Sequence, residues 1–365
     1  MVNDAIDLNS IRRVLVIKLR HHGDVLLTSP VFSVLKNHAP HLELDALVYQ
    51  ETAQMLTLHP AIREVHGIDR NWKKLGLAAQ AKAEWALLTT LRERQYDLII
   101  HLTEHPRGAW LKFLTGARYG VARKLPDTGM WWRNSFSHLY ATPRAANSRH
   151  SVELNLDALR RIGVYPNEGE RKLTLVAGDQ ADTEIKQLLA QHGLQSKAFI
   201  HIHPTSRWLF KCWPAEKTTQ LIGALQALGH AIVVTAAPDE KERALLDRIL
   251  APLQQPVVDL SGQLNLKQLA ALTAQAQLFI GVDSAPMHIA AAMQTPVVAL
   301  FGPSGENEWG PWQTLHRVIT SSHTCRPCGN DGCGGGKISE CLTTLPMERV
   351  LTAAQELINA QHDGP

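Results

Sequence analysis

The residues best placed to do chemistry stand directly after short apolar runs. Asp283, Ser284 and Ala285 follow the run Leu278–Val282 and precede an Ala-rich segment that starts with Pro286. Asp and Ser cap helices, and Pro is tolerated in a first helical turn, so the pattern predicts a buried strand that turns into a helix. The amides and positive dipole at such a helix start suit a phosphate or diphosphate. A turn that merely caps its helix would use the same residues.

Asp24 is the second candidate. It lies in the segment Arg20-His-His-Gly-Asp24, directly after the apolar run Val14–Leu19. Gly23 permits a close backbone approach. A carboxylate at the carboxyl end of a strand could accept a proton from an incoming hydroxyl group. The alternative is that Asp24 caps the helix that follows.

A third group follows the run Ala198–His203. Thr205 and Ser206 offer hydroxyl groups, and Arg207 and Lys211 offer positive charges that could neutralise a leaving diphosphate. A solvated surface loop is the alternative, although three aromatic residues between positions 208 and 213 make it unusually apolar. The chain has no Gly-x-Gly-x-x-Gly or Walker-type lysine loop, which argues against ordinary dinucleotide and NTP sites.

Two further clusters of residues each allow two interpretations. Four of the five cysteines lie close together in the sequence, at Cys325, Cys328, Cys333 and Cys341. Only the first pair has the spacing typical of zinc sites, so zinc binding and a loop of reduced thiols both stay open. A basic, aromatic stretch could bind phosphates and a bilayer surface, or could be a solvated face with two core tryptophans. It comprises Arg118, Arg123, Lys124, Trp131, Trp132, Arg133, Arg144 and Arg149.

These residues must be positioned by two series of alternating strands and helices. The first series has predicted strands at 14–19, 44–49 and 97–102, and the second has them at 198–203, 231–235, 257–260, 278–282 and 296–301. Buried strands joined through helices predict α/β domains with doubly wound parallel sheets. The polar turn at 163–170 divides the chain into domains 1–170 and 171–365. We expect these Rossmann-like domains to face each other across a cleft. The last helix could pack back on the N-terminal domain.

Composition sets the class of protein. The 365 residues are 45% hydrophobic and 19% charged, with a net charge of +3, which is typical of a globular protein and does not require a polyanion groove. The acidic start, Met1 to Asp7, predicts no signal peptide, and no apolar run approaches the roughly 20 residues of a membrane span. We therefore expect a cytoplasmic protein whose membrane contact, if any, is peripheral.

Three segments together resemble glycosyltransferase family 9, the lipopolysaccharide heptosyltransferases. They are Gly23-Asp-Val-Leu-Leu-Thr-Ser-Pro30, the loop His203-Pro-Thr-Ser with Lys211-Cys-Trp-Pro214, and Gly281-Val-Asp-Ser-Ala-Pro-Met-His-Ile-Ala-Ala-Ala292 with Phe301-Gly-Pro-Ser-Gly305. The resemblance covers nearly the whole chain, with the motifs in order. The overall pattern is most similar to the core heptosyltransferase III branch.

The resemblance implies a GT-B fold and inverting transfer of heptose from ADP-L-glycero-D-manno-heptose to a heptose of the lipopolysaccharide inner core. The branch implies that this adds the third core heptose. Asp24 would be the catalytic base, Lys211 would bind the donor phosphates, and Asp283 would contact the donor heptose. The amides of Ser284 and Ala285 would hold the diphosphate. No cofactor would be required.

The remaining residue assignments are less specific. Asp239 or Glu240 would contact the donor ribose, and Thr205, Ser206 and His288 complete the expected donor set. The expected acceptor residues are Arg20, Arg123, Lys124 and Arg133, which would meet a lipid-linked core acceptor at the inner face of the bacterial inner membrane. Nucleic acid is not an expected partner. The alternatives are a sugar-nucleotide epimerase of GT-B architecture and a non-enzymatic protein that binds zinc and nucleic acid.

Overall fold

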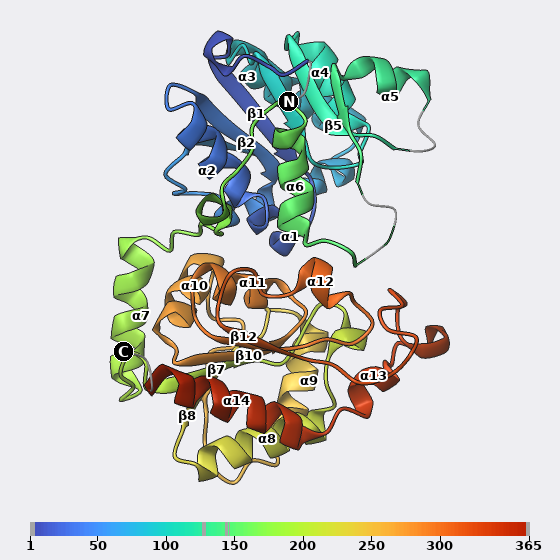
Figure 1. The fold of residues 1–365 in the computed structure, drawn as a ribbon. Helices are drawn as coiled ribbons and strands as arrows, with labels where there is room; N and C mark the ends of the chain where they lie inside the picture. Colours follow the sequence, from blue (N-terminus) through green and yellow to red (C-terminus); the bar gives the residue numbers. More distant parts are fainter. Residues whose placement is uncertain (1–3, 126–128, 143–144, 146, 363–365) are drawn as a thin grey trace. The chain divides into compact units, whose positions relative to one another are not determined.

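The computed structural model describes residues 4–125, 129–142, 145 and 147–362. It divides the chain into two compact units, one formed by residues 1–145 and 151–176 and the other by residues 146–150 and 177–365. In Figure 1 the first unit runs from blue to green and the second from green to red. Among the described residues, no helix combines the length and the hydropathy needed to cross a membrane.

The first unit contains a six-stranded sheet in which every neighbouring pair is parallel. Its spatial order is β3-β2-β1-β4-β5-β6, the order typical of dinucleotide-binding folds. The strands are β1 (Arg13–Lys18), β2 (Glu43–Tyr49), β3 (Ile62–Ile68), β4 (Leu98–His101), β5 (Tyr119–Arg123) and β6 (His138–Tyr140). The helices are α1 (His22–Leu26), α2 (Ser29–His38), α3 (Leu77–Glu93), α4 (Arg107–Thr115), α5 (Met130–Ser135) and α6 (Ser151–Arg160).

The second unit repeats this topology. Its parallel sheet has the order β12-β11-β10-β7-β8-β9. The strands are β7 (Phe199–His203), β8 (Ala231–Val234), β9 (Val258–Asp259), β10 (Leu278–Val282), β11 (Val297–Leu300) and β12 (His316–Ile319). The helices are α7 (Asp179–Gln191), α8 (Ala215–Ala227), α9 (Glu240–Leu250), α10 (Leu266–Gln275), α11 (Ala285–Ala292), α12 (Glu306–Trp309), α13 (Glu340–Thr343) and α14 (Met347–His362).

Alternation along the central strands explains why both faces of the second sheet are covered. Ile280 and its neighbours of even number on β10 pack with residues of α8, α9 and α14, whereas Phe279 packs with Met287 of α11. Successive side chains of a strand point to opposite faces, so an uninterrupted apolar run serves two hydrophobic layers. The two Rossmann-like sheets confirm the predicted α/β fold class.

The four strands that the sequence analysis did not select are β3, β5, β6 and β12. β3 carries Arg63, Glu64 and His66, β6 has three residues, and β12 contains Arg317. β3, β6 and β12 lie at sheet edges, where charged residues are tolerated because one side of the strand has no neighbour. A search for long apolar runs therefore misses these three edge strands, although it finds the edge strand β9 and misses the internal strand β5.

The division of the chain differs from the expected boundary at 170/171. The first unit continues to Val176, and the segment ending at His150 is grouped with the second unit. The backbone amide of Glu308 donates to Asn147 Oδ1 at 3.0 Å, and His150 stacks on Trp312 with ring centroids 4.3 Å apart. The last helix, α14, belongs to the second unit. The apolar side of α14 packs in the core of the second unit, with Val350, Ala354 and Leu357 fully buried.

Candidate functional site

Asp24 occupies the third position of the short helix α1, at the carboxyl end of the central strand β1. The N-cap of that helix is His21, so Asp24 does not serve as the cap. Its side chain is half-buried, and within the described part of the chain its carboxylate accepts no hydrogen bond. The local fold therefore leaves this carboxylate available to a ligand.

The charges around Asp24 gather at the end of β1. The Lys18 ammonium donates to Leu102 O at 3.2 Å and to Asn155 Oδ1 at 3.1 Å. Burial lowers the pKa of Lys18. The charges of Asp24 and Glu104 oppose this shift, and those of Arg20 and Arg123 add to it. The charges of Asp24, Arg20 and Arg123 therefore all act on the Lys18 ammonium at the end of β1.

The expected acceptor residues Arg123, Lys124 and Arg133 differ in their surroundings. Arg123 ends β5 and forms an ion pair with Glu104, whereas Lys124 is exposed and its backbone amide donates to Tyr140 O at 2.7 Å. Arg133 lies on the exposed side of α5. Sequence reasoning missed Lys18 and Glu104, although each lies at or just beyond the carboxyl end of a central strand.

The basic, aromatic stretch divides into surface and core. Trp131 is exposed, but Trp132 is buried, donates from Nε1 to Arg123 O at 3.1 Å and packs against His101 and Phe136. The hypothesis that both tryptophans face a bilayer is therefore wrong for Trp132. Arg144, which belongs to the same stretch, lies outside the described residues.

In the second unit, the strands β7 and β10 are neighbours, so the loops that follow them lie together at the carboxyl ends of the strands. Gly281 pairs with His203, and a Cβ atom on Gly281 would lie 3.0 Å from His203 O, so glycine allows the strands' close packing here. Beyond these positions, Lys211 Nζ lies 2.6 Å from Asp283 Oδ2. Both side chains are largely shielded from solvent, with 21% and 8% of their surfaces exposed. The pair unites two residues that are 72 positions apart in the sequence.

Lys211 is held by the apolar residues around it. It ends a single 3₁₀ turn, Leu209–Lys211. Phe210 is buried and its carbonyl accepts the Ser339 hydroxyl at 2.6 Å, while Trp213 is buried and donates to Leu345 O at 3.2 Å. Two of the three aromatic residues that make this loop unusually apolar, Phe210 and Trp213, thus fix the backbone on both sides of Lys211, whereas Trp208 is exposed.

Helix α11 starts at the same edge. Its N-cap is Ser284 in an extended conformation, Ala285 is its first residue, and His288 is buried within it. The Ser284 side chain makes no capping bond to the helix, and its hydroxyl donates to Val282 O at 3.3 Å instead. The positive end of the α11 dipole therefore lies beside the Lys211–Asp283 pair, in an arrangement suited to an anion.

The carboxylates after β8 have separate tasks. Asp239 caps α9, since its Oδ1 accepts from the amides of Lys241 at 2.9 Å and Glu242 at 3.2 Å, and Glu240 is exposed. Glu242 is buried and accepts the hydroxyl of Thr205 at 2.7 Å. Ser206 accepts at Oγ from the Trp208 amide at 3.3 Å. Glu242 could not be selected from the sequence, because this glutamate lies inside a helix, where a glutamate usually faces solvent.

Two neutral histidines lie beneath this edge. Thr273 Oγ1 donates to Leu269 O at 2.7 Å, so it accepts from His201 Nδ1 at 3.1 Å. His201 Nε2 then accepts the Thr235 hydroxyl at 2.7 Å, and Thr235 Oγ1 accepts from His203 Nδ1 at 2.8 Å. Burial lowers the pKa of His203 to about 4 and that of His201 well below its ordinary value. This chain of bonds fixes His203 as the Nδ1–H tautomer at the end of β7.

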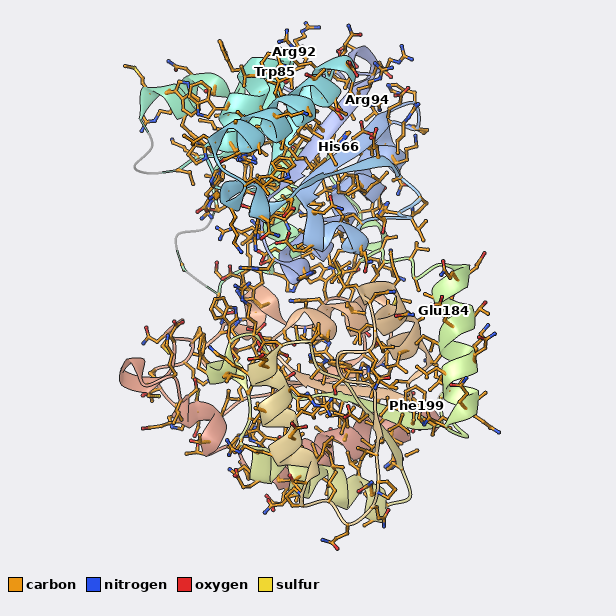
Figure 2. The ribbon with its side chains drawn as sticks, turned by 180° about the vertical axis from the view of Figure 1, so that it is seen from behind. His66, Trp85, Arg92, Arg94, Glu184 and Phe199 are labelled. Carbon is orange, nitrogen blue, oxygen red and sulfur yellow. The ribbon has the colours of Figure 1, made fainter. Side chains whose placement is uncertain are left out.

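Metal-ligating residues gather at a different place from the cysteines. Among the described residues, Asp45, Glu64 and His66 form the one group of three or more such side chains whose ligand atoms all lie within 4.8 Å of one another. Asp45 already pairs with Arg94 at 2.8 Å, and its pKa is lowered to about 2 by hydrogen bonds from His66, Arg94 and Tyr96, which outweigh its burial. Figure 2 labels His66 and Arg94 of this network. The Asp45–Arg94 contact in this network is a structural ion pair.

The loop that carries the cysteines packs against the turn that follows β11. Cys325, Cys328 and Cys333 are exposed free thiols and Cys341 is buried. Between them, Arg326 is almost fully shielded, donates to Gly302 O at 2.7 Å and pairs with Glu306 at 3.1 Å. The loop is therefore fastened to the turn that follows β11.

Comparison with known proteins identifies the family. The model of the family described as glycosyltransferase family 9 (heptosyltransferase) matches residues 84–338. Lipopolysaccharide heptosyltransferase 3 of Escherichia coli K12 is 33% identical over 344 residues, covering 93% of this chain and 96% of that protein.

Solved structures agree at the level of the fold. The glycosyl transferase family 9 protein of Veillonella parvula has a TM-score of 0.83 at 22% identity and covers 98% of this chain and 100% of its own. The Escherichia coli heptosyltransferase WaaC with ADP-2-deoxy-2-fluoro heptose has a TM-score of 0.69 at 18% identity, over 96% and 99%. With the family model spanning most of the sequence and a curated relative aligned along nearly all of it, the chain belongs to glycosyltransferase family 9 and is a heptosyltransferase of lipopolysaccharide core synthesis.

Proposed function

We propose that this protein transfers heptose, with inversion, from ADP-L-glycero-D-manno-heptose to a heptose of the lipopolysaccharide inner core, and that it adds the third core heptose. The observation that carries the proposal is Asp24 at the carboxyl end of β1, a half-buried carboxylate that accepts no hydrogen bond from the described residues and whose charge acts on Lys18. The name of the Escherichia coli relative supports the third position, and the sugar nucleotide bound by WaaC supports the donor.

The reaction is a single displacement. Asp24 takes the proton of the acceptor hydroxyl while its oxygen attacks the anomeric carbon of the donor. The bond between that carbon and the diphosphate oxygen breaks, and one displacement from the opposite side inverts the configuration. Lys211 and the start of α11 stabilise the negative charge on the departing ADP. These groups supply the charge that the leaving group needs, so the reaction requires no cofactor.

The residues proposed to bind the donor contact different parts of it. Lys211, Ser284 and Ala285 meet the diphosphate, and Asp283 meets the heptose. Glu242, bonded to Thr205, replaces Asp239 and Glu240 as the carboxylate proposed to meet the ribose, because Asp239 is engaged as a helix cap and Glu240 is exposed.

The acceptor is an anionic, lipid-linked core sugar. Arg20 and Arg123, whose charges act on Lys18 together with that of Asp24, would meet the phosphate groups of the acceptor, as would the exposed Lys124 and Arg133. The enzyme would work at the cytoplasmic surface of the inner membrane, where such an acceptor is displayed, and nucleic acid would not be a partner.

The decisive test mixes purified enzyme with ADP-heptose and lipopolysaccharides truncated after one, two or three core heptoses, and measures product masses. We expect one heptose to be added to the two-heptose acceptor and none to the one-heptose acceptor. NMR of the product should show the inverted anomeric configuration. EDTA should leave the rate within about twofold. An altered sugar nucleotide formed without acceptor would instead indicate an epimerase.

A further inference from the structure

Helix α4 exposes an apolar stripe on the side opposite its core face. Gly108, Ala109 and Leu111 of this helix are buried. On the other side Trp110 is 53% exposed, Phe113 71% and Leu114 39%. These positions follow the i, i+3, i+4 spacing of one helical face, where a surface helix usually carries polar residues.

Helix α5 extends this stripe into a patch. Met130 is 76% exposed and Trp131 44%, and the rings of Trp110 and Trp131 lie 4.8 Å apart between centroids. Figure 1 shows α4 and α5 side by side. We call these residues the α4–α5 patch: Trp110, Phe113, Leu114, Met130 and Trp131. A contiguous exposed group of this kind marks an interaction surface.

The charges of the surrounding segment select the partner. Residues 104–140 contain six Lys and Arg but only two acidic residues, Glu104 and Asp127. Glu104 is paired with Arg123, Arg107 is paired with Glu84 of α3, and Asp127 lies outside the described residues. Lys112 lies on α4 and the exposed Arg133 on α5, so cations occur on both helices of the patch.

We propose that the α4–α5 patch docks the protein reversibly on an anionic lipid bilayer. Aromatic and aliphatic side chains would enter the interface, and the cations beside them would meet lipid phosphates. A second copy of the chain is a poorer occupant, because a two-fold interface would bring the same cations of both copies face to face.

The position of the patch gives docking a use. Glu104, just before α4, and Arg123, before α5, are both among the charges around Lys18 at the Asp24 edge. Docking would therefore hold this edge close to the bilayer that carries a lipid-linked acceptor. This consequence rests on the proposed function, whereas the docking itself does not.

The experiment measures sedimentation of the full-length protein with vesicles. Vesicles of phosphatidylglycerol and phosphatidylethanolamine are compared with phosphatidylcholine vesicles, at low and high salt. We expect binding to the anionic vesicles that weakens with salt. The variant Trp110→Ser with Phe113→Ser should lose at least tenfold in partition coefficient. Leu228→Ser with Leu315→Ser, at exposed apolar positions of the second unit, should bind like the wild type.

A second readout guards against misfolded variants. Brominated lipids should quench wild-type tryptophan fluorescence, and Trp110→Phe with Trp131→Phe should remove that quenching while retaining binding. The serine variant should keep its rate on a water-soluble acceptor and lose it on acceptor embedded in vesicles. Vesicle binding without any heptosyl transfer would refute the proposed function and leave docking intact.

The docking proposal is overturned if the wild type ignores anionic vesicles, or if the serine variant binds them as the wild type does. Conversion of a wild-type dimer to monomer by the serine substitutions, without vesicle binding, would assign the patch to self-association. Binding of polynucleotide in place of vesicles would likewise overturn it.

Discussion

At the scale of single residues, a substitution of Asp24 distinguishes most clearly between a catalytic carboxylate and one that only caps a helix. Asp24→Asn keeps the shape of the side chain but cannot accept the hydroxyl proton. We expect turnover to fall by about 10²–10⁴-fold with unchanged ADP affinity and melting temperature. Steady-state kinetics and calorimetry check this. Near-normal turnover would show that the carboxylate is not the base.

The Lys211–Asp283 pair calls for a double-mutant design, because Lys211→Met alone strands a shielded carboxylate and destabilises the protein. We expect Lys211→Met to weaken ADP binding by about 10- to 100-fold, the loss of one charge-assisted hydrogen bond. Asp283→Asn should keep or strengthen ADP binding, since a negative charge beside the diphosphate is removed, and should slow transfer.

The double variant, Lys211→Met with Asp283→Asn, distinguishes the two roles of the lysine. Its stability should recover because neither charge is left alone, yet its ADP affinity should stay low. Calorimetric titration that gave wild-type ADP affinity for the double variant would reduce Lys211 to a structural partner of Asp283.

At the scale of elements, helix α9 supplies both a cap and a buried carboxylate within four residues. Asp239→Ala should cost about 1 kcal/mol of unfolding free energy through the lost cap, and Asp239→Asn almost nothing, since Asn also caps well. Both variants should bind ADP within about twofold of the wild type. Chemical denaturation and calorimetry test this. Weakened ADP binding by the stable Asn variant would restore Asp239 as a ligand contact.

At the scale of the whole molecule, buried neutral histidines make stability depend on pH. Burial lowers the pKa of His101 in the first unit to about 4. In the second unit it lowers the pKa values of His150 and His203 to about 4 and that of His201 well below its ordinary value. Below pH 6.5 these histidines bind protons in the unfolded chain but stay neutral in the folded chain. The free energy of unfolding is therefore highest above pH 6.5 and falls towards pH 4.

Each such histidine contributes a slope of up to about 1.4 kcal/mol per pH unit in this window. The second unit should therefore lose stability faster than the first as the pH falls. Urea unfolding at several pH values, followed separately in the two units, measures this dependence. The variant His203→Gln should reduce the slope of unfolding free energy against pH in the second unit by the contribution of one histidine. A pH-independent stability of the second unit between pH 6.5 and 4 would contradict the assignment.

The sequence by itself determined the central strands apart from β5, the fold class and the positions of the chemical motifs. Apolar runs such as Val14–Leu19 and Leu278–Val282 had to become strands buried on both faces, and the residues after them had to lie at a sheet edge. Asp24, Lys211 and Asp283 could be selected for this reason. Edge strands such as β3 could not, because their solvent side carries charges.

Only the tertiary structure decided which partners these residues have. The contact of Lys211 with Asp283 spans 72 positions, and that of Thr205 with Glu242 spans 37, so local patterns hold no record of either. Trp131 and Trp132 are adjacent in the sequence, yet one is exposed and the other buried. Their difference arises because neighbouring residues of a helix point about 100° apart, and which direction meets the core depends on the sheet that the helix covers.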